Sequence, residues 1–203
     1  MRSFPSTSLR TGAALRTTVV ATRRAMLTLL AAGAPAAQAQ LKQPPPPSQA
    51  PQSVWYAVRG PDNAFIVDMP GEPVYKLIDT ASPGGTKFVY HSYSLDYRRL
   101  SFVAQTALYP ADVDVSQPKF NLQSVLDDRA QRLAGGKWAR IEWREVLGAP
   151  AAESTGSVAG GNVLRQLVLL KGRRYVSLAC LGPADSLRTP EVERFFKSLR
   201  FGA

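Results

Sequence analysis

The fold of this chain is decided near its C-terminus, where residues 189–201 read TPEVERFFKSLRF. Thr189 belongs to the residue types favoured at a helix N-cap, Pro190 suits the first helical position, and Glu191 complements the helix dipole. The apolar positions that follow recur at helical spacing and form one stripe: Val192, Phe195, Phe196 and Leu199. The sequence therefore predicts a closing helix whose apolar stripe packs against a sheet.

Upstream of this helix, apolar runs bounded by Gly, Pro, Asn and Asp predict eight strands. The run 100–109 is apolar on both faces, as expected of a central strand that is covered on both sides. The glycine-rich stretch 156–161 is predicted to be a flexible connection. The expected strands cover residues 54–58, 64–69, 75–81, 88–97, 100–109, 138–147, 163–170 and 175–181.

A second helix is expected between the fifth and sixth of these strands. Apolar residues recur there at helical spacing until Gly135 and Gly136, which stop the helix. Short strands pairing through tight turns, with only two helices, indicate an α+β fold with an antiparallel β-sheet flanked by helices. We expect this fold to form a single domain over residues 54–203.

Residues 1–39 have the pattern of a cleavable export signal. Arg23 and Arg24 precede a short apolar run, and Ala37 and Ala39 form a peptidase-like ending. The arginine pair resembles a twin-arginine signal, with Sec export as the alternative. Either route predicts a periplasmic or secreted protein, while the absence of acidic residues before Asp62 leaves an organellar lumen open. The apolar run is too short for a membrane span, so no transmembrane segment is expected after cleavage.

The composition after residue 39 excludes several classes of protein. Residues 40–53 are rich in Pro and Gln, as in a semi-rigid linker. Removing the signal lowers the net charge from +10 to +5, because 20 basic and 15 acidic residues remain. The basic residues form no run interleaved with aromatics, so nucleic acid is not an expected partner.

Cys180 is the one cysteine and His91 the one histidine, which limits the catalytic possibilities. A single cysteine allows no internal disulfide, and Cys180 shares a strand face with Val176 and Leu178, which predicts a buried, inert thiol. His91 is expected to pack on its strand, hydrogen-bonded to a tyrosine or a backbone group. A Cys180–His91 dyad has no further support, because both positions are interior to strands.

No metal or cofactor site is expected. The pairs Asp112 and Asp114, and Asp127 and Asp128, lack the continuation of a calcium loop. The glycines of 156–161 lack the Lys-Ser or Lys-Thr of a phosphate-binding loop.

Two predicted turns carry clustered basic residues: Arg98 and Arg99 in one, and Lys171, Arg173 and Arg174 in the other. Exposed turns are common recognition positions, and arginine forks bind carboxylates and phosphates in pairs of hydrogen bonds. We interpret the two turns as a docking surface, while charges that block edge pairing remain the simpler alternative.

The order of elements resembles the PsbP-like family of α/β/α sandwiches. The resemblance rests on residues 65–73, FIVDMPGEP, and on residues 193–201, ERFFKSLRF, and it covers about 54–201. Known branches of that family bind other proteins, a photosystem in the thylakoid lumen and a small GTPase in the nucleus. The resemblance therefore implies a binding role, although fold does not determine function.

Together these observations predict an exported, non-enzymatic binding or accessory protein that recognises a protein partner or an anionic surface. The alternative is a small periplasmic hydrolase or ligand-binding enzyme with a pocket near His91.

Overall fold

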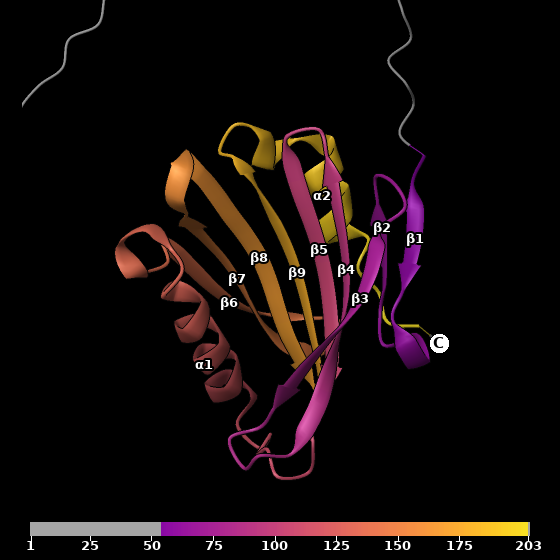
Figure 1. The fold of residues 1–203 in the computed structure, drawn as a ribbon, viewed down its shortest axis with the longest axis vertical. Coiled ribbons are helices and arrows are strands. Elements are labelled where there is room, and N and C mark those ends of the chain that lie inside the picture. Colours follow the sequence, from indigo (N-terminus) through magenta and orange to yellow (C-terminus); the bar gives the residue numbers. More distant parts are fainter. Residues whose placement is uncertain (1–53, 203) are drawn as a thin grey trace, which may run out of the picture. The chain divides into compact units, whose positions relative to one another are not determined.

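A computed structural model describes residues 54–202 and shows a seven-stranded antiparallel sheet as the centre of the fold (Figure 1). Its spatial order is β3-β4-β5-β9-β8-β7-β6, so β5 and β9 join two meanders. The predicted α+β class with an antiparallel sheet is confirmed. The strands are β3 (Val74–Ala81), β4 (Lys87–Tyr97), β5 (Leu100–Leu108), β6 (Arg140–Val146), β7 (Ala149–Ser157), β8 (Asn162–Lys171) and β9 (Arg174–Pro183).

The described residues all belong to one unit of the chain, Gln49–Ala203. The predicted export signal and Pro-rich linker, with Arg23, Arg24, Ala37 and Ala39, lie outside the described residues. Short 3-10 helices connect the larger elements, at Pro61–Asn63, Ala134–Gly136, Ala159–Gly161 and Ser186–Arg188. Among residues 54–202, no helix has both the length and the apolar character to cross a membrane.

One face of the sheet is covered by the hairpin of β1 (Tyr56–Arg59) and β2 (Ile66–Met69) together with α2 (Pro190–Lys197). The predicted closing helix is confirmed, and its stripe is buried, with the Phe195 ring packed edge-on against Phe102 at 5.2 Å. Thr189 occupies the N-cap, but its hydroxyl makes no capping hydrogen bond. Backbone bonds between Ile66 and Arg200 tie the C-terminal segment to β2.

The opposite face is covered by α1 (Pro118–Ala130), which packs on β7 and β8 through Leu122 and Leu126. The indole of Trp138 donates a hydrogen bond to the Leu126 carbonyl at 2.8 Å, which fixes the chain after the helix. The helix ends at Ala130, earlier than the Gly135 stop that the sequence indicates. Leu133 is still buried, but it lies in the segment that follows the helix.

Strand β7 is the one strand of the described residues that the sequence does not predict. Its last two residues, 156 and 157, fall in the stretch expected to be a flexible connection. The strand is built mostly from small residues with low β propensity, so its sequence does not indicate a strand. Their size has a packing reason: a Cβ added to Gly156 would lie 2.6 Å from a methyl of Leu133 and 3.1 Å from the ring of Trp138. The segment that follows α1 therefore packs close to the backbone of β7.

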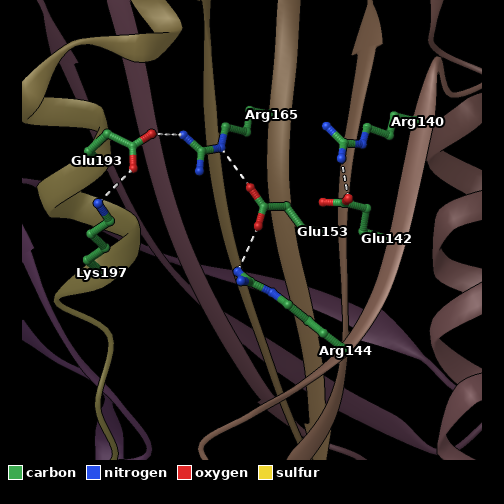
Figure 2. A network of polar contacts seen from close by, with 7 residues as sticks. All are labelled: Arg140, Glu142, Arg144, Glu153, Arg165, Glu193 and Lys197. Atoms are coloured by element: carbon green, nitrogen blue, oxygen red, sulfur yellow. Dashed lines mark hydrogen bonds and ion pairs between the residues drawn. The ribbon is translucent and has the colours of Figure 1, made fainter.

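Charged side chains form a connected network between α2 and the strands beside it (Figure 2). Glu153 on β7 bridges Arg144 at 2.7 Å and Arg165 at 2.9 Å. Arg165 also pairs with Glu193 of α2 at 2.6 Å, and Glu193 pairs with Lys197 at 3.3 Å. The network links β6, β7, β8 and α2, so it holds the helix to the sheet beyond the apolar core.

Replacing Arg165 by Ala should destabilise the domain by about 2 kcal/mol, because its guanidinium bonds two carboxylates and stacks on the Phe196 ring at 4.5 Å. Arg140→Ala is the matched control, since the Arg140–Glu142 pair of β6 is exposed and should contribute less than about 0.5 kcal/mol. Urea unfolding of both variants measures the difference. Equal losses would show that the network contributes nothing beyond a surface pair.

Acid should weaken this network through Glu193. The hydrogen bond from Arg165 lowers the pKa of Glu193 below its ordinary value. Its contribution to stability is therefore complete above the unfolded-state pKa, about 4.3, and is lost as the pH falls through the folded-state pKa. The difference in unfolding free energy between the wild type and Glu193→Gln should shrink below about pH 4. A difference that stays constant in urea titrations down to about pH 3 would contradict this assignment.

Candidate functional site

A row of polar side chains crosses the α1 side of the sheet, where apolar residues would be expected. Gln105 on β5 lies opposite Ser92 on β4 and opposite Ser177 on β9. Gln166 on β8 lies diagonally across from Ser177, since its direct partner on β9 is Ala179, and Ser154 on β7 lies opposite Gln166. Four of these five residues are buried, and buried polar groups cost free energy unless they find partners. We call these five residues the polar row.

Arg129, in the last turn of α1, extends its guanidinium over the polar row. One terminal nitrogen donates to Gln166 Oε1 at 2.6 Å and to Ser177 Oγ at 3.3 Å, and the other donates to Gln105 Oε1 at 3.4 Å. All three acceptors are neutral. No salt bridge of Arg129 is found among residues 54–202, so its charge is held between the helix and the sheet without a protein anion.

Three buried polar atoms in or beside the polar row have no hydrogen-bond partner in the described part of the chain. They are Oγ of Ser154, Nε2 of Gln166, whose residue is 0% exposed, and the phenol oxygen of Tyr175, whose residue is 1% exposed. Burial raises the pKa of the neighbouring phenols of Tyr90 and Tyr109, which therefore stay protonated at neutral pH. These two phenols are hydrogen-bonded to each other, so the donors left without an acceptor near Arg129, among residues 54–202, are Gln166 Nε2 and the Tyr175 hydroxyl.

Two cavities open beside Arg129. The smaller, 260 Å³, is lined in part by Gln166 and Ser177 of the polar row. The larger, 670 Å³, is lined by Tyr90 and Tyr175 but also by two carboxylates, Asp79 and Asp128. The cavities adjoin, because Gln105, Arg129 and Arg132 line both. The smaller cavity, which has no carboxylate in its lining, offers a fixed cation with amide and hydroxyl donors in a partly open space, and these together suit the binding of an anionic ligand.

The structure places the two basic turns at opposite ends of β5, so their residues do not lie side by side. Arg98 and Arg99 precede the first residue of β5, whereas Arg174 pairs with Leu108 at the other end of that strand. Because β5 has nine residues, the turns lie about 27 Å apart along the sheet. The β4–β5 turn precedes β5 and the β8–β9 turn precedes β9. Because β5 and β9 are antiparallel, these two turns lie at opposite ends of the sheet.

Most of the basic residues in these turns already have partners within the chain. Arg173 donates to the carbonyls of Tyr109 and Val113, both at 2.9 Å, and so holds the loop that leads to α1. Its role in this structure is to position that loop. The remaining contacts are Lys171 over the Phe201 ring, Arg174 with Asp62, and Arg98 with Glu191.

The predicted states of His91 and Cys180 are confirmed. His91 Nδ1 is hydrogen-bonded to the Tyr75 phenol at 2.7 Å, and Cys180 is a free, fully buried cysteine. The two do not form a dyad. His91 is level with Thr106 of β5, whereas Cys180 is level with Phe102, four residues further along the sheet and one strand beyond β5.

The acidic pairs have ordinary structural partners where the structure shows them. Asp112 accepts a hydrogen bond from the Ser82 hydroxyl, and Asp114 accepts one from the Ser116 amide at 2.8 Å. Asp127 accepts one from Gln123 at 2.7 Å. Within residues 54–202, no group of three or more His, Cys, Asp or Glu side chains is arranged to hold a metal ion.

Sequence analysis missed the residues of the polar row and Arg129. A signal was present, because Gln105, Gln166 and Ser177 each interrupt an otherwise apolar strand. Their meeting depends on the order of the strands, since residues from β5, β8 and β9 become neighbours only in the folded sheet.

No protein-family model matches this chain, and no curated protein matches it. The chain is similar in structure to cyanobacterial PsbP (CyanoP) from Synechocystis sp. PCC 6803, known from a solution structure. The sequence identity is 13%, the TM-score is 0.47, and the similarity covers 74% of this chain and 94% of that one. A TM-score of 0.47 is too low to assign this chain to the PsbP-like family, so that assignment stays a prediction.

The thiol of Cys180 should be unreactive in the native protein. Burial raises its pKa to about 12, so that only about one thiol in ten thousand is ionised at pH 8. Ellman's reagent should modify it only after unfolding in urea. Stoichiometric labelling of the native protein at the rate of a free thiol would show that this face of the sheet opens readily.

Proposed function

We propose that this protein is a non-enzymatic binding protein that holds a small anionic ligand at Arg129. The observation that carries the proposal is the pairing of Arg129 with three neutral acceptors, beside the unpartnered Nε2 of Gln166. A carboxylate or another oxyanion at this position would neutralise the cation and accept the free hydrogen bonds.

The physical basis is the cost of a half-buried charge. A guanidinium that has lost part of its hydration gains more from an anion than an exposed one does, since the effective dielectric constant is lower. Charge-assisted hydrogen bonds are also about twice as strong as neutral ones. Gln105, Gln166 and Ser177 hold the guanidinium in one orientation, so little conformational entropy is lost on binding.

The broader setting of this function comes from the sequence and is proposed with it. Residues 1–39 would direct export, and the mature PsbP-like α/β/α domain would act in the periplasm or outside the cell. The hydrolase alternative has no structural observation in its favour, because His91 is bound to Tyr75 and lines neither of the two cavities at Arg129.

Arg129→Gln tests the proposal in a thermal-shift assay against acetate, benzoate, succinate and inorganic phosphate. At least one of these anions should raise the melting temperature of the wild type. The variant should bind that anion at least about tenfold more weakly, because it loses charge-assisted hydrogen bonds worth about 1.5–3 kcal/mol.

Arg140→Gln is the matched control, since it removes the same charge from an exposed position on β6. This variant should respond to the anion as the wild type does. If none of the four anions stabilises the wild type, or if both variants respond alike, the assignment of Arg129 as the anion site is wrong.

A further inference from the structure

The smaller cavity beside Arg129 changes character along its length. One part is lined by Arg129 and the polar-row residues Gln105, Gln166 and Ser177, and Arg132 also lines the cavity. The other end is apolar, although it opens from the same space. It is lined by Val103, Leu133, Val158, Leu164 and Ala179.

The strand register sets the distance between these two ends. Gln105 is paired with Ser177, and two residues along the same strands Val103 is paired with Ala179. On β8, Leu164 is likewise two residues from Gln166. Because two residues of a strand span about 7 Å, Val103 and Leu164 lie at that distance from Gln105 and Gln166 along their strands, whereas Ala179 is paired directly with Gln166.

The apolar end of the cavity lies beyond the C-terminus of α1, where the helix no longer covers the sheet. The helix ends at Ala130, and Leu133 from the following segment and Val158 from the β7–β8 connection line this part of the cavity. Leu133 is buried, whereas Val103, Val158, Leu164 and Ala179 remain half-buried. Half-buried apolar side chains around a cavity gain free energy when an apolar group covers them.

We infer that the smaller cavity binds a monocarboxylic acid with a compact apolar body, of about the size of one six-membered ring. This inference rests on the proposed anion site at Arg129. The carboxylate accepts hydrogen bonds from Arg129 and from Gln166 Nε2, and the body lies against Val103, Leu164 and Ala179. The volume of 260 Å³ is ample, since a cavity of about 150 Å³ already holds benzene.

The apolar lining disfavours a ligand with a polar body. Polar atoms placed against Val103 and Leu164 would lose water without gaining hydrogen bonds, which costs free energy. The part of the ligand that lies against these residues is therefore apolar.

The experiment titrates the full chain with benzoate, acetate or benzamide. Binding is followed by the NMR signals of residues 54–203. Acetate supplies the carboxylate alone, and benzamide supplies the ring without the charge. Benzoate should bind about tenfold or more tightly than either, because it gains both the charge-assisted bonds and the burial of the ring. Its ring protons should give nuclear Overhauser contacts to the methyl groups of Val103, Val158 and Leu164.

Two variants test the apolar end of the cavity separately from the anion site at Arg129. Leu164→Phe and, independently, Val158→Phe enlarge side chains that line the apolar end. Each should weaken benzoate by about tenfold while leaving acetate unchanged. Circular dichroism checks that each variant folds, and the second variant serves if the first does not fold.

The outcomes distinguish this inference from the proposed function. If acetate and benzoate bind equally at Arg129, the apolar end is not used and the inference fails, while the anion site stands. Ring contacts to Ile78 and Tyr90, which line the larger cavity, would also overturn it. If no carboxylate binds in an Arg129-dependent way, the proposed function fails as well.

Discussion

The antiparallel pairing of β5 with β9 is the contact on which the rest of the structure depends. β5 ends at Leu108 and β9 begins at Arg174, so the pairing closes a long loop that contains α1 and the strands β6, β7 and β8. Closing such a loop costs entropy that only a well-packed sheet can repay. Once formed, the pairing merges two meanders into one sheet and leaves β3 and β6 as its edges.

This one pairing builds two different faces, because successive side chains of a strand point to opposite sides. On one side Phe102 lies beside Cys180, and α2 with the β1–β2 hairpin completes an apolar core. On the other side Gln105 lies beside Ser177, and α1 packs mainly on β7 and β8. The polar row and the adjoining cavities therefore lie where a single helix leaves part of the sheet uncovered.

Arg129 links the stability of this face to its binding capacity. Its guanidinium satisfies the side-chain oxygens of Gln105, Gln166 and Ser177, and its position in the last turn of α1 suits the negative end of the helix dipole. These structural roles hold the charge in place without neutralising it. An arginine fixed in this way is preorganised for an anion, whereas those of the basic turns are exposed or already engaged in holding loops and ion pairs.

The sequence by itself determined the local elements of this protein. Helical spacing predicted α2 and most of α1, and alternation or apolar runs predicted eight of the nine strands, because these patterns reflect burial within a single element. It also predicted a buried Cys180 and a His91 bonded to a tyrosine or a backbone group. It missed β7, whose small residues have low strand propensity and are required by the close packing of Leu133 and Trp138 on Gly156. Only the tertiary structure decided which strands are neighbours. That order separated the two basic turns and assembled the polar row under Arg129. Contacts between residues far apart in the chain depend on strand pairing, and strand pairing produces no periodic pattern in the sequence.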